Sequence, residues 1–169
     1  HGQTIVPAGL NNVVAIAAGG ETSLALKADG TVVAWGFNGN GETTIPAGLA
    51  NVIGIAVGGS HCVALKADGT VVAWGKNTSG QSTVPAGLEN VVCVAAGRSH
   101  TAALKADGTV VTFGSSYASV PTGLNNVIAI GAAGGGETPL ALKADGTVVA
   151  WGNNAGGMAT VPAIRMSPN

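Results

Sequence analysis

The chain consists of one sequence unit copied four times. The string KADGTVV begins at Lys27, Lys66, Lys105 and Lys143, so successive copies lie 39, 39 and 38 residues apart. A second string, PAGL or PTGL, begins at Pro7, Pro46, Pro85 and Pro121, and a degenerate copy begins at Pro162. Repetition at a period of roughly 20 to 50 residues is typical of solenoids, propellers and arrays, in which each unit buries its apolar faces against its neighbours. The chain must therefore fold as a row of similar units.

Each unit predicts short β-strands and no helix. In the first unit, apolar stretches cover Val13–Ala18, Ser23–Lys27 and Thr31–Gly36, each bounded by Gly, Asp or Pro. Such short segments between turn-forming residues indicate strands. The residues 28–30, Ala-Asp-Gly, predict a tight turn, because Asp and Gly tolerate the left-handed backbone region. A short fourth strand is expected at 43–45, ending at a proline that cannot donate to a strand ladder.

These strands are apolar on both faces rather than alternating, as in Val13-Val14-Ala15-Ile16 and Val32-Val33-Ala34-Trp35. Sheets that are buried on both faces have this pattern. A four-stranded sheet of about 40 residues between two neighbours describes a propeller blade. We therefore predict an all-β fold of four blades, each a four-stranded antiparallel sheet. The blades are expected at 12–50, 51–89, 90–125 and 126–163, with 1–11 overlapping the end of a preceding blade. One aromatic position recurs in every unit and predicts a repeated packing layer: Trp35, Trp74, Phe113 and Trp151.

Composition excludes several alternatives. The chain has 28 glycines in 169 residues, which is incompatible with a coiled coil. Its 46% hydrophobic and 9% charged residues argue against disorder. Gly, Asp, Lys and Asn interrupt each apolar run before it reaches the roughly 18 residues of a membrane span. The net charge of −1 lacks the basic footprint of a protein that binds nucleic acid or an anionic membrane.

The pattern AIAAGG-x-x-S-LALK-x-DGTV-x-AWG-x-N-x-x-GQ resembles the repeat of the regulator of chromosome condensation family, over essentially the whole chain. The stretches GQTIVPAGL at 2–10 and GQSTVPAGL at 80–88 are similar to bacterial secreted members of propeller fold, which include a β-lactamase inhibitor. This resemblance implies a β-propeller, whose rings usually have seven blades.

Four repeats are fewer than such a ring contains, and three interpretations follow. The chain is part of a longer array, or two or more chains pair into a larger ring or stack, or four blades close alone. An open array leaves two apolar blade faces uncovered, and such faces favour association.

Positions that differ between repeats are free to serve a binding site, and they cluster in two loops per unit. The loop after the first strand contains Glu21-Thr22, Ser60-His61, Arg98-Ser99-His100 and Glu137-Thr138; the loop after the third contains Phe37–Asn40, Lys76–Thr78, Ser115–Tyr117 and Asn153-Asn154. Loops on a rigid scaffold commonly carry binding residues. The predicted partner-binding residues are Glu21, Phe37, Asn38, His61, Lys76, Arg98, His100, Tyr117 and Glu137, with the two aromatic residues as anchors.

We identify no catalytic constellation, metal site or cofactor site. The repeated turn supplies one aspartate per unit, and carboxylates spread in this way do not converge as acid–base catalysis requires. His61 and His100 lie 39 residues apart at one repeat position. The resemblance implies a structural hydrogen bond there, because the family often has His at this position, and a metal-binding pair is the alternative. Cys62 and Cys93 are expected to be small core residues with free thiols.

These observations predict a non-catalytic protein-interaction scaffold, with no cofactor and with a protein partner or a second copy of itself as ligand. The resemblance to secreted members implies an extracellular or cell-surface location in a bacterium. The alternative is a proteinaceous inhibitor of a hydrolase such as a β-lactamase. Nucleotide exchange and chromatin binding, known in the family, are disfavoured by the missing basic face.

Overall fold

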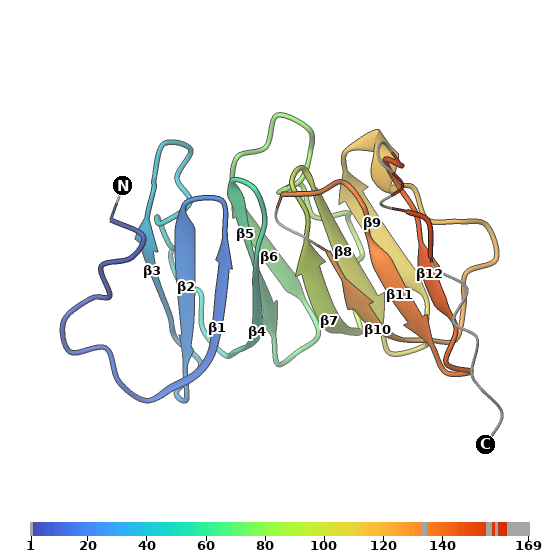
Figure 1. Cartoon of the computed structure of the whole chain (residues 1–169). Coiled ribbons are helices and arrows are strands. Elements are labelled where there is room, and N and C mark those ends of the chain that lie inside the picture. The colour runs from blue at the N-terminus through green and yellow to red at the C-terminus, as the bar shows by residue number, and fades with distance from the viewer. Residues whose placement is uncertain (1, 133–134, 155–156, 158, 162–169) are drawn as a thin grey trace, which may run out of the picture.

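The computed structural model describes residues 2–132, 135–154, 157 and 159–161. Four three-stranded antiparallel sheets follow one another along the chain, each a simple meander of consecutive strands (Figure 1). Sheet A contains β1 (Val13–Gly19), β2 (Thr22–Lys27) and β3 (Val32–Gly36); sheet B contains β4 (Val52–Val57), β5 (His61–Lys66) and β6 (Val71–Gly75); sheet C contains β7 (Val91–Ala96), β8 (His100–Lys105) and β9 (Val110–Gly114); sheet D contains β10 (Val127–Gly131), β11 (Leu140–Lys143) and β12 (Val148–Ala150). A single turn of 3-10 helix, η1, covers Ser116–Ala118. None of the described segments is a helix with the length and hydrophobicity that a membrane crossing requires.

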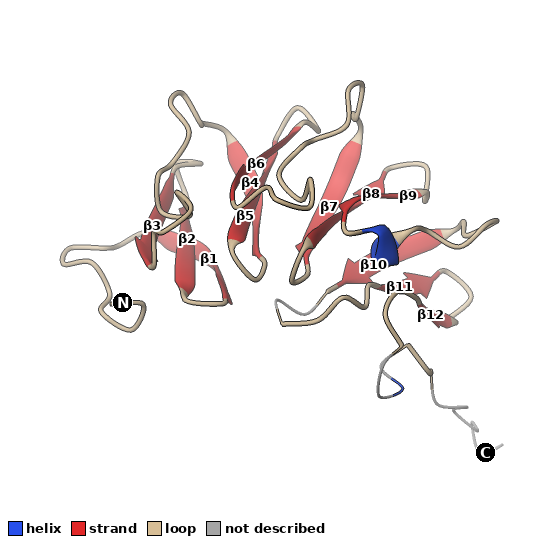
Figure 2. Ribbon diagram, turned by 90° about the horizontal axis from the view of Figure 1, so that it is seen from above, coloured by secondary structure: helices blue, strands red, loops and turns tan. Residues whose placement is uncertain are grey.

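The sheets stack face to face in an arc (Figures 1 and 2). The first strands of adjacent sheets contact one another, and from there the sheets diverge toward their third strands. This arrangement confirms the all-β propeller-type fold. Sheet A and sheet D lie at opposite ends of the arc, so closure of four blades into a ring, one of the three interpretations above, is not what the chain adopts.

Small residues allow the close approach at the first strands. A Cβ atom on Gly19 would overlap the backbone carbonyl groups of Val57 and Gly58 in the next sheet. Toward the third strands, where the sheets diverge, the linker between blades fills the widening gap. Ile45 and Leu49 of the linker pack in the hydrophobic cluster between sheets A and B. Each junction is therefore three layers thick at its outer side: sheet, linker, sheet.

The expected fourth strand at 43–45 is absent, and each sheet has three strands instead of four. The linker bonds to side chains of the following sheet rather than to a strand ladder. The Glu42 carbonyl accepts hydrogen bonds from Trp74 Nε1 at 2.7 Å and from Cys62 Sγ at 3.5 Å. The same linker position serves the other sheets: Gln3 O accepts from Trp35 Nε1, Gln81 O from Thr101 Oγ1, and Ala118 O from Trp151 Nε1. Three residues of the predicted aromatic layer, Trp35, Trp74 and Trp151, thus each donate a hydrogen bond to a linker carbonyl.

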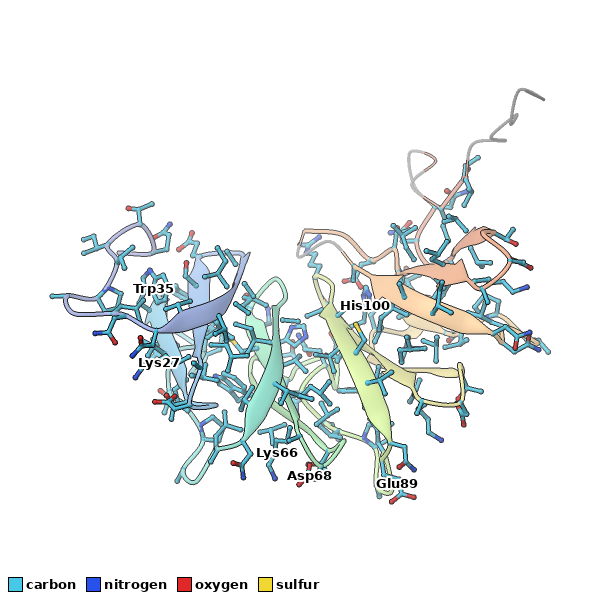
Figure 3. The ribbon with its side chains drawn as sticks, turned by 90° about the horizontal axis from the view of Figure 1, so that it is seen from below. Lys27, Trp35, Lys66, Asp68, Glu89 and His100 are labelled. Carbon is cyan, nitrogen blue, oxygen red and sulfur yellow. The ribbon has the colours of Figure 1, made fainter. Side chains whose placement is uncertain are left out.

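The KADG turns lie along the lower edge of the sheets in Figure 1 and are seen from below in Figure 3. Asp29 Oδ1 accepts from the Thr31 hydroxyl at 2.6 Å and from the Thr31 backbone N–H at 3.0 Å. These two bonds hold the pKa of Asp29 near 2. The sequence predicts an intrablade hairpin turn here, and the structure adds an interblade role.

That interblade role is a backbone hydrogen bond from the first strand of the following blade. Three successive junctions repeat it: Val52 N to Gly30 O at 3.1 Å, Val91 N to Gly69 O at 3.1 Å, and Val127 N to Gly108 O at 3.0 Å. The glycine at this turn has a φ of +78° in the first three repeats, and a Cβ there would lie 3.2 to 3.3 Å from the next blade's asparagine Cα. Turn geometry and close packing between blades therefore both require glycine.

Candidate partner-binding surface

The two variable loops of each blade meet along the upper edge of the sheets in Figure 1. One backbone hydrogen bond joins them in every blade: Phe37 N to Glu21 O, Lys76 N to Ser60 O, Ser115 N to Ser99 O, and Asn153 N to Glu137 O, at 2.8 to 3.1 Å. We call these four loop pairs the upper surface. Because a backbone bond fixes each pair, the main chain keeps one geometry in all four blades even where the side chains differ.

Phe37 and Glu21 line a cavity of about 380 Å³ between the upper loops of sheets A and B, together with Glu42 and Ser60. The Phe37 ring lies over Gly39, where a Cβ would overlap it. The Glu42 side chain is buried, and its carboxylate accepts from the Asn40 backbone N–H at 2.8 Å and from Asn40 Nδ2 at 2.6 Å. Glu42 therefore braces the loop that carries Phe37.

Asn38 holds the same loop from inside. Its Oδ1 accepts from the Thr43 backbone N–H at 2.9 Å. The equivalent bonds recur at Asn77 with the Ser82 N–H and at Asn154 with the Ala159 N–H. This recurrence assigns Asn38 a loop-forming role, so the side chain that varies beside it is Phe37.

The other predicted surface residues are distributed along the arc. Tyr117 is 61% exposed on η1 above sheet C, and Arg98 and Lys76 are exposed on the loops of sheets C and B. Phe37 belongs to the loops of sheet A and Tyr117 to those of sheet C, so the two aromatic anchors stand apart and do not form one cluster.

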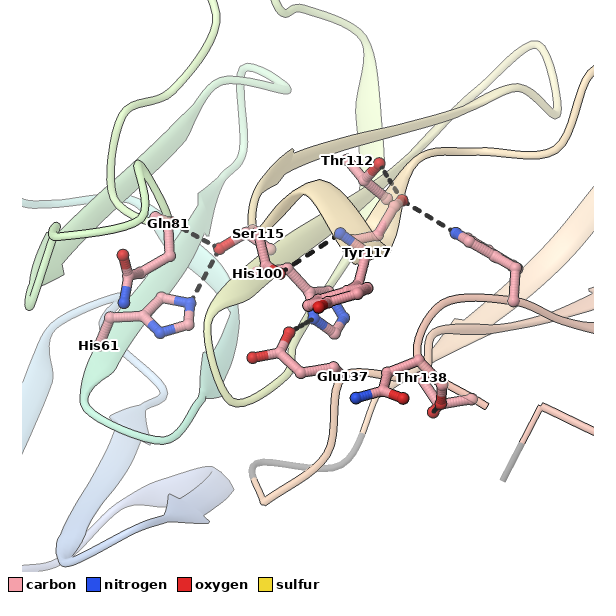
Figure 4. A network of polar contacts seen from close by, with 12 residues as sticks. His61, Gln81, His100, Thr112, Ser115, Tyr117, Glu137 and Thr138 are labelled. Atoms are coloured by element: carbon pink, nitrogen blue, oxygen red, sulfur yellow. Dashed lines mark hydrogen bonds and ion pairs between the residues drawn. The ribbon is translucent and has the colours of Figure 1, made fainter. Parts of the chain in front are cut away.

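His61 is fully buried and links sheet B to sheet C. Its Nε2 lies 2.9 Å from Thr101 Oγ1, which in turn lies 2.9 Å from the Gln81 carbonyl oxygen (Figure 4). The single hydroxyl proton of Thr101 goes to the carbonyl, which cannot donate, so His61 donates from Nε2. His61 Nδ1 has no hydrogen-bond partner. Burial, with a smaller contribution from nearby His100, lowers the pKa of His61 to about 4.

His100 is also fully buried but uses its other ring nitrogen. Its Nδ1 lies 3.1 Å from Glu137 Oε2, which links sheet C to sheet D (Figure 4). The reason is a substitution in the fourth repeat: Pro139 stands where the third repeat has Thr101, so His100 Nε2 meets no hydroxyl and has no partner. Glu137 supplies the interblade bond instead.

The structure thus places His61 and His100 inside the blade junctions and not on the partner-binding surface, where the sequence had placed them. The reason is that the upper loops pack against each other between blades, so the inner residue of each loop is covered. The described residues contain no group of three or more His, Cys, Asp or Glu side chains that could hold a metal ion.

Both cysteines are free, as expected. Cys62 is buried, and burial raises the pKa of its thiol to about 12. Cys93 is half-buried, and burial raises its pKa as well. Neither thiol therefore has the character of a reactive nucleophile.

Solved structures with the same architecture include propellers about twice as long as this chain. Yeast RCC1 (Prp20), solved bound to Kap60, matches with a TM-score of 0.73 and 24% identity, over 88% of this chain and 46% of that chain. The ectodomain of the receptor kinase CR4 from Physcomitrella patens matches with a TM-score of 0.74 and 27% identity, over 93% of this chain and 45% of that chain. The computationally designed Ika4 protein matches with a TM-score of 0.53 and 20% identity, over 83% of this chain and 90% of that chain. The chain therefore spans about half the length of the two natural propellers.

Among curated proteins, no sequence matched the chain. The profile of the Regulator of chromosome condensation (RCC1) repeat matches residues 13–42, 52–81 and 91–118, which is 88 of the 169 residues and so more than half of the chain. The matched segments coincide with the three strands and the following upper loop of sheets A, B and C. By this match, the chain belongs to the regulator of chromosome condensation repeat family.

Proposed function

We propose that the chain is a non-catalytic scaffold that binds a protein partner through its upper surface. The observation that carries this proposal is the contrast within each loop pair. The backbone bond between the two loops is the same in all four blades, whereas the residue that donates it differs in every blade: Phe37, Lys76, Ser115 and Asn153. A rigid main chain that presents variable side chains is how binding loops are commonly organised on stable folds.

The character of the surface favours a protein as partner. It carries charges of both signs, with Lys76 and Arg98 in the middle blades and Glu21 on the loops of sheet A. The predicted binding residue Glu137 does not contribute, because its carboxylate contacts buried His100 and its side chain is only 14% exposed. Tyr117 adds an exposed aromatic ring with a polar tip, a residue type enriched in protein interfaces. The solved relatives are consistent with this reading, because yeast Prp20 was crystallised with Kap60 and a second study concerns its binding to Gsp1p and histones.

We also propose that the protein acts outside the cell or on the cell surface of a bacterium. This part rests on the resemblance of residues 2–10 and 80–88 to secreted members of the family. Fractionation of the source cells with an antibody against the chain tests the location; a signal confined to the cytoplasmic fraction would contradict it.

Selection of protein binders against the immobilised chain tests the surface. We expect selected binders to lose at least about tenfold in affinity when Lys76, Arg98 and Tyr117 are replaced together by alanine. The matched control replaces Lys27, Lys66 and Lys105 at the lower turns and should leave affinity unchanged. Binders that respond to the lower-turn variant and ignore the upper one would refute the assignment.

Inhibition of a hydrolase is the second candidate, favoured by the exposed Tyr117 ring and by the resemblance noted above. The test is titration of a β-lactamase with the purified chain while hydrolysis of a chromogenic substrate is followed. Stoichiometric loss of activity that Tyr117→Ala abolishes would support inhibition. Unchanged hydrolysis at saturating chain would exclude β-lactamases as targets and leave the scaffold proposal standing.

A further inference from the structure

The two ends of the arc carry opposite halves of one interblade junction. At the junction between sheets A and B, Leu24 and Leu26 of β2 project from sheet A and are 0% and 3% exposed. They pack against Val52, Val57 and Trp74 of sheet B and against Ile45 and Leu49 of the linker. One side of the junction thus supplies a pair of leucines, and the other supplies an apolar surface built from sheet and linker.

Sheet D repeats the leucine half, and in the described part of the chain no further sheet receives it. Leu140 and Leu142 occupy the positions of Leu24 and Leu26 in the fourth repeat, within the same string LALKADGTVVAWG. They are 42% and 37% exposed. We call this surface, completed by Val148 and Ala150 opposite them on β12, the D face.

Sheet A repeats the receiving half at the other end of the arc. An open, largely apolar cavity of about 580 Å³ lies on its outer side. Its lining includes the equivalents, 39 positions earlier, of the residues that hold Leu24 and Leu26: Val6, Leu10, Val13, Ala18 and Trp35. Val13 is 38% exposed, whereas its equivalent Val52 is 3% exposed. We call this surface the A face; Trp35 marks it at one end of the arc in Figure 3.

The backbone carries the same complementarity. Three junctions each contain a hydrogen bond from a first-strand valine N–H to the glycine carbonyl of the preceding KADG turn. The equivalent groups at the two ends are the Val13 N–H on the A face and the Gly146 carbonyl on the D face. In a further junction they would form the same hydrogen bond. Both apolar and polar parts of the junction are therefore available between the ends.

We propose that the D face of one chain docks onto the A face of a second copy of this chain, and that two such junctions close two arcs into one ring. The occupant is a second copy because the D face supplies the leucine pair that the A-face cavity lacks, and the other chain returns the same pair. This chain matches 45% and 46% of the length of two natural propellers, so two copies have about the length of one natural ring. Two arcs of four sheets make a ring of eight blades, one more than the seven usual in the family. Such contacts join unlike surfaces and form a closed assembly when the rotation between copies permits it.

The test is the mass of the 169-residue chain in solution, by light scattering and native mass spectrometry over a wide concentration range. We expect about twice the 16.2 kDa of one chain. A mass of one chain at every concentration would overturn the proposal and point to other blades as the natural cover of these faces. An open-ended series of masses would overturn ring closure.

Single-face variants test the pairing of unlike faces. Leu142→Asp on the D face and Val6→Asp on the A face should each weaken dimerisation by on the order of 100-fold, because each buries an unpaired carboxylate in both junctions. Both side chains are exposed in the single arc, so the variants should fold, which circular dichroism checks. Val92→Asp, on an exposed position of the middle sheet C, is the matched control and should remain dimeric.

Mixing the two variants gives the decisive result. Leu142→Asp retains an intact A face and Val6→Asp retains an intact D face, so an equimolar mixture should form a heterodimer through one intact junction. If instead either variant alone stays dimeric, like faces pair with each other and the head-to-tail proposal is wrong.

Discussion

Replacement of Thr101 by valine should destabilise the fold far more than its small change in shape suggests. Valine has nearly the same volume as threonine, so packing is preserved and only the hydroxyl is lost. That hydroxyl accepts from His61 Nε2 and donates to the Gln81 carbonyl, both at 2.9 Å and both in the interior. Its removal leaves one buried donor and one buried acceptor without a partner. His61 cannot escape by moving its proton, because its Nδ1 also lacks a partner.

The expected cost follows from those two groups. Each buried polar group left unsatisfied costs about 1–3 kcal/mol, so Thr101→Val should lose roughly 2–6 kcal/mol. For a chain of this size, at about 2–4 °C per kcal/mol, that corresponds to a fall in melting temperature of roughly 4–24 °C. Thr101→Ser keeps the hydroxyl and gives up one methyl group, for about 1 kcal/mol.

Urea denaturation followed by tryptophan fluorescence measures both variants against the parent chain. The ranking expected is parent, then serine, then valine, with unchanged dependence on denaturant concentration. If the valine variant matches the parent, or the serine variant is the less stable of the two, the interblade hydrogen bond does not contribute as described.

Three further predictions concern the same interior. The pKa of His61 falls from its usual 6.5 to about 4 on folding. Between these pH values, His61 is therefore protonated in the unfolded chain but not in the folded chain. Stability should therefore decline as pH falls through that window, by up to about 3 kcal/mol, and His61→Thr should remove this part of the decline in acid titrations of the unfolding midpoint. Burial of Cys62 predicts that native protein reacts with at most one equivalent of a thiol reagent, at Cys93, and that denatured protein reacts with two; two rapid equivalents in the native state would contradict the burial. Gly69→Ala should lower the stability of the fold more than Gly87→Ala, although both glycines have φ near +77°. A Cβ at Gly69 would lie 3.2 Å from the backbone of the next blade, whereas one at Gly87 would meet no atom within 4 Å. Equal falls in melting temperature would show that only the backbone conformation matters.

Much of the fold could be predicted because its determinants are local. Turn chemistry in KADG and the short apolar runs between glycines are properties of neighbouring residues, and they identified the strands and the repeated unit. The fourth strand at 43–45 was wrongly predicted because its residues do suit a strand. The adjacent Glu42 carbonyl instead accepts from Trp74 Nε1, 32 residues away in the next blade, and no local pattern shows that a side chain replaces the ladder.

The site divides in the same way. Variation between repeats was sufficient to find the upper loops, since it reflects positions that no blade needs for folding. It also selected His61 and His100, which vary for a different reason: each adapts to the residue that the following blade offers, Thr101 in one case and Glu137 in the other. A residue that varies between repeats because it contacts the following blade cannot be distinguished, from one sequence, from a residue that varies because it is exposed on the surface.

The clearest division lies in the string LALKADGTVVAWG, which the first and fourth repeats share. The sequence alone determined that both copies form two strands joined by a tight turn, because backbone propensity and turn geometry act within the string. Only the tertiary structure decided that Leu26 is 3% exposed while Leu142 is 37% exposed. Burial requires an adjacent blade: sheet A has sheet B on its leucine side, whereas among the described residues no sheet follows sheet D.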